Sequence, residues 1–140
     1  MSDCIFCNIV SGKLPSSIVY RGRSSSAFMD IQPVNPGHVL VIPNVHAIGL
    51  ADLEEHAGAD MFRVAQRVAA ALRTSGLKCE GVNLFLADGV AAGQEVFHVH
   101  LHVFPRYSAD GFGLKFPPSY ADKPERRELD AIALQIRNAL

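Results

Sequence analysis

The sequence has almost no excess of charge of either sign. Its 13 lysines and arginines are matched by 14 aspartates and glutamates, which leaves a formal net charge of −1. A protein that binds a long nucleic acid needs a concentrated basic surface, so this balance argues against that class of partner. A mononucleotide needs only a few donors, so a ligand of that size remains open.

Long apolar runs and targeting features are also missing. No apolar run approaches the length that crosses a membrane. The first seven residues lack the basic and apolar regions of a secretory leader. We therefore expect a cytoplasmic protein without a membrane partner.

Cysteine is scarce, with three in the chain. Three thiols cannot all pair within one chain and cytosolic thiols stay reduced, so metal binding or plain thiols are favoured over disulfides. Cys4 and Cys7 have the CxxC spacing that brings two thiolates to one metal, although two buried thiols are the plainer alternative. No βαβ pattern follows, which argues against a redox pair, and Cys79 is expected to be a plain thiol.

The chain reads as one domain over residues 1–140, without repeats, low-complexity tracts or linkers. Periodicity predicts a short helical segment at 4–12 and a main helix at 57–73, with Asp52 and Glu55 resembling a capping box before it. A final helix is expected to start near Pro124. Short apolar runs with tight connections predict an α+β fold with antiparallel strands at 18–21, 26–31, 38–43, 81–87 and 98–106.

Three of the six histidines lie within five residues, at His98, His100 and His102. On a strand, alternate side chains share one face, so the three imidazoles would line one face while the intervening aliphatic residues face the core. Strict alternation of this kind is rare by composition, which makes surface decoration a poor explanation.

One interpretation of this row is that it binds a metal. A closed zinc site wants four ligands, which Cys4, Cys7, His46 and one histidine of the row would supply. A catalytic zinc held by all three histidines of the row is the alternative, but it makes no use of the cysteine pair.

The other interpretation of the histidine row is nucleophilic catalysis. A neutral imidazole attacks phosphorus and leaves well, provided that its second nitrogen is fixed by a hydrogen bond. The loop of small residues at 88–95 runs straight into the row, and its backbone amides are suited to phosphate oxygens.

The segment from Gly93 to Phe104 resembles the histidine triad (HIT) motif, His-φ-His-φ-His-φ-φ. Upstream segments at 4–9, 27–31 and 36–43 resemble the other blocks of the family in the same order. The resemblance covers about residues 3–107, leaves 108–140 as an extension, and is closest to the Hint-like bacterial branch. It implies a HIT-like fold of five antiparallel strands with one main helix and a C-terminal helix, paired into a homodimer.

The resemblance also assigns roles, residue by residue. His100 matches the nucleophile that takes up a nucleotidyl group, His102 the histidine that contacts the phosphate, and His38 a further histidine behind the triad. Asp30 matches the acid that binds the ribose hydroxyls. The purine slot and the phosphate-side loop match Ile5, Phe6, Ile9, Phe28, Ile31, Gly93, Gln94 and Glu95. Structural zinc is implied at Cys4, Cys7, His46 and His98, with no catalytic metal.

Two positions depart from the Hint-like pattern, since Ala87 replaces an asparagine and Glu95 replaces a serine tied to leaving-group protonation. The resemblance implies a purine nucleotide-binding hydrolase or transferase that acts on nucleoside 5′-monophosphate derivatives, with phosphoramidates first, through a nucleotidyl-histidine. The alternatives are a Fhit-like diadenosine polyphosphate hydrolase, suggested by the tail at 104–106, and a nucleotide-binding or scaffold protein with weak activity.

Overall fold

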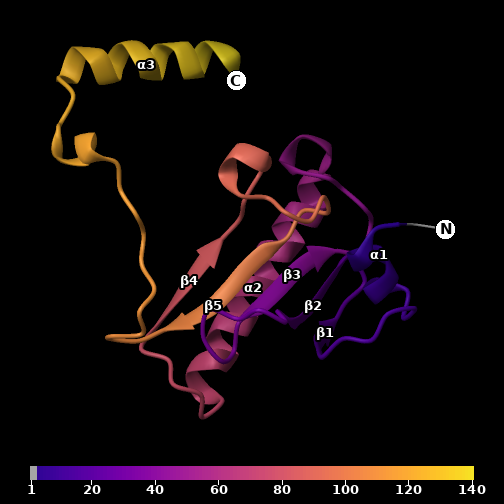
Figure 1. The fold of residues 1–140 in the computed structure, drawn as a ribbon. Coiled ribbons are helices and arrows are strands. Elements are labelled where there is room, and N and C mark those ends of the chain that lie inside the picture. Colours follow the sequence, from indigo (N-terminus) through magenta and orange to yellow (C-terminus); the bar gives the residue numbers. More distant parts are fainter. Residues whose placement is uncertain (1–2) are drawn as a thin grey trace. The chain divides into compact units, whose positions relative to one another are not determined.

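A computed structural model describes residues 3–140 and confirms the α+β fold (Figure 1). One five-stranded antiparallel sheet has the order β1-β2-β3-β5-β4. Its strands are β1 (Ile18–Arg21), β2 (Ser25–Met29), β3 (Val39–Pro43), β4 (Gly81–Phe85) and β5 (Leu101–Arg106). The helices are α1 (Ile5–Val10), α2 (Glu55–Thr74) and α3 (Arg126–Ala139), with short 3-10 turns at Leu50–Asp52, Val90–Ala92 and Pro118–Ala121.

The central strand β3 is buried along its whole length, and its alternate side chains serve two cores. Val39 and Val41 pack with the buried stripe of α2, while Leu40 and Ile42 pack with Phe6 of α1. The helices α1 and α2 therefore cover opposite faces of the sheet (Figure 1). Because both faces are covered, the strand reads as a continuous apolar run.

The main helix begins later than the capping-box signal indicated. Asp52 belongs to the preceding 3-10 turn, where its carboxylate accepts the amides of Ile48 and Gly49, and α2 starts at Glu55. The predicted box was wrong because Asp52 stabilises the turn rather than the helix. Gly76 follows the end of the helix with a φ of 88°, a conformation that favours glycine at a helix C-terminus.

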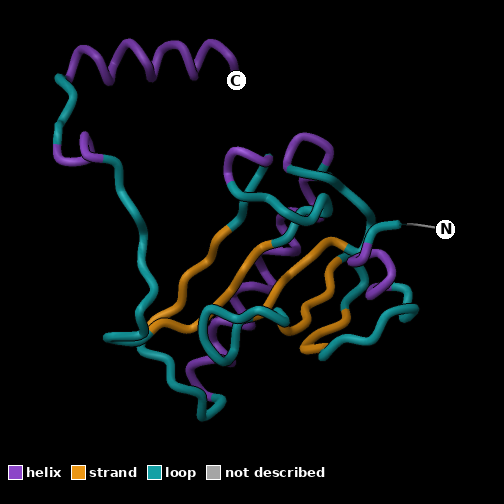
Figure 2. The backbone as a smooth tube through the Cα atoms, viewed as in Figure 1, coloured by secondary structure: helices purple, strands orange, loops and turns teal. Residues whose placement is uncertain are grey.

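The predicted histidine strand is also shorter than expected. β5 begins at Leu101, so His98 and His100 lie in an irregular segment before it (Figure 2). The β3–β5 ladder contains three pairs, from Val41↔Leu101 to Val39↔Val103, and stops there. The alternation of apolar residues continues upstream, but β3, which extends to Pro43, forms no further pairs with this segment.

Contacts divide the chain into one unit that ends at Asp110 and a second that covers Gly111–Leu140. Arg106 closes the first unit through two hydrogen bonds to the Asp110 carboxylate, at 2.6 and 2.9 Å. The second unit contains α3, the helix expected after Pro124, and its apolar residues Leu129, Ile132 and Ile136 are exposed. Within residues 3–140, no helix has the length and apolar character of a membrane span.

Candidate functional site

The three triad histidines gather on the α1 face of the sheet. His102 pairs with Leu40 across the β3–β5 ladder, and Leu40 packs with Phe6 on that face. The Phe6 ring in turn makes edge contacts with His98 and His100, with centroid distances of 5.8 and 5.3 Å. The fold thus keeps the three triad imidazoles near one another, as the alternation predicted, although only His102 lies on a strand.

One nitrogen of His100 is fixed by the backbone. Its Nδ1 lies 2.8 Å from the carbonyl oxygen of His98, and a carbonyl can only accept, so Nδ1 carries the proton and donates it. The Nε2 lone pair of the neutral ring is therefore left for a reaction. The residue is buried, with 6% of its surface exposed, so few alternative partners can compete for the ring.

A chain of hydrogen bonds also fixes the tautomers of His38 and His102. The Val34 amide donates to His38 Nδ1 at 3.0 Å, so the proton of neutral His38 sits on Nε2. That Nε2 lies 2.8 Å from His102 Nδ1 and donates to it. The remaining proton of His102 is consequently on Nε2, where it can be donated to a bound group.

Both rings of this pair are held neutral. Burial lowers the pKa of His38, and the nearby Asp30 carboxylate only partly offsets this effect. Burial, with smaller contributions from His100 and His38, lowers the pKa of His102 to about 4. A neutral pair at pH 7 agrees with the hydrogen-bonded chain, in which His38 accepts once and donates once and His102 accepts once.

Asp30 joins this pair from the end of β2. Its amide donates to the His38 carbonyl at 3.0 Å, and its Oδ2 lies 3.5 Å from His38 Nε2. The ligand atoms of Asp30, His38 and His102 fall within 4.8 Å of one another, a spacing that a metal could use. However, His38 already accepts at Nδ1, so a metal at Nε2 would displace its only proton, and a hydrogen-bonded cluster fits this set better.

A second cluster combines Cys4, Cys7, His46 and His98, whose ligand atoms lie within 4.8 Å of one another. The Sγ atoms of Cys4 and Cys7 lie 3.4 and 3.6 Å from His98 Nδ1. His46 Nδ1 lies 3.4 Å from Cys7 Sγ and 3.2 Å from His98 Nδ1.

These separations fit four-coordinate zinc. Tetrahedral bonds of ordinary length put a sulfur and a nitrogen ligand about 3.6 Å apart and two nitrogen ligands about 3.4 Å apart. His98 also has the required tautomer, because its Nε2 donates to the Pro43 carbonyl at 2.8 Å and leaves Nδ1 with a lone pair. Burial lowers the pKa of His98, which favours the neutral ring that a metal needs.

The residues of the expected purine slot separate into two groups. Phe6, Ile9 and Phe28 are buried in the α1 core, with 3–7% of their surface exposed. Ile5 and Ile31 are exposed at 47% and 93%. The first three therefore form a packed floor, and the last two are the members that a ligand could cover.

The loop before the triad is braced from within. Gln94 is buried, accepts the Gly89 amide at 2.8 Å, and donates to the carbonyls of Ile48 and Val96. Gly93 has a φ of 94°, and Glu95 is exposed. These hydrogen bonds make Gln94 the residue that stabilises the loop, while Gly93 and Glu95 lie at the surface of the loop.

Sequence reasoning missed the backbone groups that set these tautomers. The Val34 amide and the carbonyls of Pro43 and His98 each fix one imidazole. No residue type signals such a contact, since every residue but proline carries both backbone groups.

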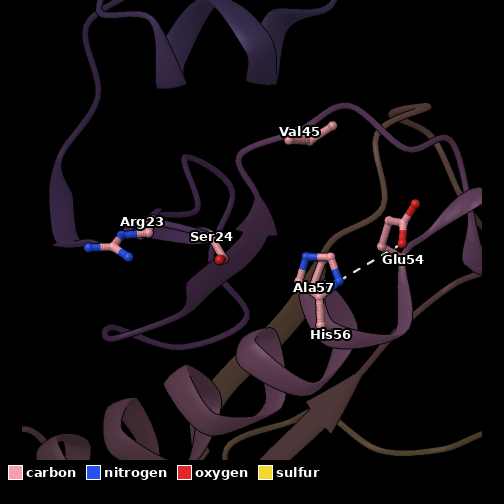
Figure 3. A pocket seen from close by; sticks show the side chains of 6 residues that line it. All are labelled: Arg23, Ser24, Val45, Glu54, His56 and Ala57. Atoms are coloured by element: carbon pink, nitrogen blue, oxygen red, sulfur yellow. Dashed lines mark ion pairs between the residues drawn. The ribbon is translucent and has the colours of Figure 1, made fainter.

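A separate pocket of about 370 Å³ is lined by Arg23, Ser24, Val45, Glu54, His56 and Ala57 (Figure 3). None of these residues belongs to either cluster. The picture shows His56 beside Glu54, and the pair is 3.9 Å apart and highly exposed. A weak surface ion pair of this kind does not suggest chemistry.

The fold and the site together define an α+β protein whose histidines are clustered on one face of an antiparallel sheet. The family model described as the HIT domain matches residues 11–109. The chain therefore belongs to the HIT family, a superfamily of nucleotide-binding hydrolases and transferases, as the motif indicated.

Three relatives illustrate the match. The chain is 36% identical to Protein hit of Bacillus subtilis over 99% of this chain and 94% of the relative, and a HIT family crystal structure from that species has a TM-score of 0.90, covering 99% and 98%. A zinc-bound histidine triad family protein from Mycobacterium smegmatis is 39% identical, with coverage of 99% and 98% and a TM-score of 0.77. A histidine triad nucleotide-binding protein from Candida albicans is 28% identical, with coverage of 98% and 96% and a TM-score of 0.86.

Proposed function

We propose that this protein binds a purine nucleotide and transfers it through a covalent bond to His100. The observation that carries the proposal is the 2.8 Å hydrogen bond from His100 Nδ1 to the His98 carbonyl, which leaves Nε2 as a free nucleophile. The substrate class is a nucleoside 5′-monophosphate derivative, with phosphoramidates first. The similarity to a nucleotide-binding histidine triad protein supports this class.

The proposed reaction has two steps. The Nε2 lone pair of His100 attacks the α-phosphorus, the bond from phosphorus to the leaving amine breaks, and the amine takes up a proton. Water then attacks the same phosphorus, the phosphorus–nitrogen bond to His100 breaks, and the nucleotide leaves. A transferase would use another acceptor hydroxyl in place of water.

His102 and His38 support the phosphate. The Nε2–H of His102 is the donor that the hydrogen-bonded chain leaves available, and its ring centroid lies 5.0 Å from that of His100. We assign it as a hydrogen-bond donor to a phosphoryl oxygen. Glu95 replaces the expected serine and is exposed, so the proton of the leaving amine would come from water. His38 fixes the His102 tautomer from behind.

The nucleoside part would be held by Asp30 and the exposed apolar residues. Asp30 Oδ1 accepts the Gln32 amide at 2.9 Å, and a carboxylate retains further lone pairs for ribose hydroxyls. Ile31 follows it in sequence and is 93% exposed, which leaves its side chain free to contact a base. Gly93, whose amide donates to the Val90 carbonyl at 3.0 Å, would lie on the phosphate side.

We also propose structural zinc at Cys4, Cys7, His46 and His98. The ligand spacing, the His98 tautomer and the zinc-bound relative support it. Bound there, the metal would tie α1, the loop after β3 and the segment before β5 together, and His100 would not be among its ligands. Three histidines sharing a catalytic metal are not favoured, since His98 and His102 fall in different clusters among the described residues.

The nucleophile is tested by turnover of an adenosine 5′-phosphoramidate. We expect His100→Ala to lower kcat by about 10³-fold or more, because no other group in the site replaces the attacking nitrogen. Intact-mass measurement of the parent during turnover should show one added nucleotidyl group, absent from the variant.

His56→Ala is the matched control, since its side chain is exposed and lies outside both clusters. Persistent turnover in His100→Ala would exclude the assignment. Parallel assays with a diadenosine polyphosphate separate the two hydrolase classes, and nucleotide binding without turnover in the parent would favour the binding or scaffold role.

A further inference from the structure

The segment that carries the proposed nucleophile lies outside the β3–β5 ladder. The β3–β5 ladder ends at Val41↔Leu101, and residues 96–100 belong to no strand (Figure 2). Ladder hydrogen bonds therefore hold His102 but not His100. Some other set of contacts must hold the His100 backbone and ring in place.

Two of these contacts come from the loop after β3. The Val99 amide donates to the Ala47 carbonyl at 2.8 Å, and His98 Nε2 donates to the Pro43 carbonyl at 2.8 Å. Both acceptors flank His46, which belongs to the cysteine–histidine cluster. The loop that helps to hold the nucleophile segment is therefore also the loop that supplies a metal ligand.

His98 connects the cluster to the nucleophile through three separate groups. Its Nε2–H is bonded to Pro43, its Nδ1 faces Cys4, Cys7 and His46, and its carbonyl accepts the Nδ1–H of His100. Movement of His98 would therefore move the acceptor that sets the His100 tautomer. The residue is fully buried, so its ring cannot turn to solvent.

Without a cation the cluster is poorly matched. The two thiols can each donate to an imidazole, Cys4 to His98 and Cys7 to His46. His98 Nδ1 can only accept, because its Nε2 donates to Pro43, so both thiols and the His46 ring face one lone pair, at 3.4, 3.6 and 3.2 Å. A bound metal matches the set, because both imidazole lone pairs and both thiolates can bind it.

We propose that metal bound at the cysteine–histidine cluster positions His100 for attack, with His98 as the positioning residue. This inference rests on the proposed nucleotidyl transfer to His100 and on zinc at the cluster. Phe6 adds a second connection, since it lies between the two cysteines in sequence and its ring contacts those of His98 and His100. Loss of metal should release both connections without removing any group that touches the substrate.

The test uses His46→Ala in the full-length chain, compared with His46→Cys and with His56→Ala. His46 is the exposed ligand and makes no described contact with His100, so its loss should leave the core folded. At stoichiometric zinc chloride we expect His46→Ala to lose bound zinc and to lower kcat about 10- to 100-fold with little change in KM. His46→Cys, which keeps a zinc ligand, should retain zinc and kcat.

A spectroscopic measurement separates positioning from general damage. In ¹⁵N-histidine NMR at fixed pH, zinc-loaded parent should show His100 as a single Nδ1–H tautomer, and His46→Ala should show both tautomers. Zinc chloride added in excess over the protein should restore zinc content, the single tautomer and kcat together in this variant. The His56→Ala control should match the parent in every measurement.

The outcomes are distinguishable. The positioning role is overturned if His46→Ala loses zinc while kcat and the His100 tautomer stay unchanged, or if fully active parent contains no metal. If the tautomer follows zinc but the parent turns over no nucleotide substrate, the proposed function fails and the positioning role stands. Thermal unfolding of each variant identifies any that do not fold, and chelation of zinc from the parent then provides the same comparison.

Discussion

The three triad histidines differ in what fixes each ring. His98 donates to Pro43 and faces the cysteine pair, His100 donates to the His98 carbonyl, and His102 accepts from His38. Neighbours only two residues apart thus have different free nitrogens and different chemistry. The hydrogen-bond partner of one nitrogen decides the task of the other.

The lowered pKa of His102 makes a prediction for stability. Its pKa in the folded protein is about 4, against an ordinary value of 6.5, so the unfolded chain binds the proton first as the pH falls. The free energy of unfolding should therefore decrease between pH 6.5 and about 4, and Tm should fall by roughly 10 °C from this group. Thermal unfolding across this range measures the effect.

The matched variant is His102→Asn, which keeps an acceptor for the Nε2–H of His38 but cannot titrate. Its Tm should depend less on pH than that of the parent, both being measured with zinc present. His56→Asn, at an exposed site, should follow the parent curve. Equal slopes for His102→Asn and the parent would contradict the assignment.

At the scale of elements, two helical layers pack on opposite faces of one sheet. The α2 stripe fills one face, and α1 with its cysteine pair fills the other. Stability and chemistry are consequently separated by the sheet itself. Substitutions in the α2 core should change the free energy of unfolding more than they change the chemistry at His100.

Met61 tests this separation. It is 2% exposed in the α2 core, so Met61→Ala should lower the free energy of unfolding by about 2–5 kcal/mol through lost burial and a cavity. Gln66→Ala, on the exposed face of the same helix, should change it by less than about 0.5 kcal/mol. Urea unfolding compares the two, and equal effects would show that the helix does not bury the predicted face.

At the scale of the whole molecule, the two edges of the sheet are different. β1 has an irregular register between Ile18 and Tyr20, whereas β4 pairs regularly with β5 over five residues. A bulged edge resists pairing with another chain, and a regular edge permits it. We therefore expect the homodimer implied by the family resemblance to form through β4.

Leu84 on β4 is 39% exposed and Ile18 on β1 is 36% exposed, which makes them a matched pair. Leu84→Lys should shift the protein toward monomer in sedimentation velocity, because a charge on a regular edge opposes pairing. Ile18→Lys should leave the association state of the parent unchanged. A monomeric parent, or dissociation by the β1 variant instead, would contradict the β4 interface.

The sequence by itself determined which chemically active side chains are present and where most of the helices and strands lie. Alternation and turn residues predicted the strands to within about two residues, except that β5 starts three residues late. The HIT-like pattern identified the histidines, and the CxxC spacing identified the cysteine pair. These signals are local, so they can be read from neighbouring residues.

Only the tertiary structure decided how these groups are matched. Cys4 and His98 are 94 residues apart in sequence yet face each other at 3.4 Å. The ladder stops before His100 although β3 continues to Pro43, and backbone groups set each tautomer. Every residue offers similar backbone groups, so which one meets an imidazole depends on where the chain returns in space.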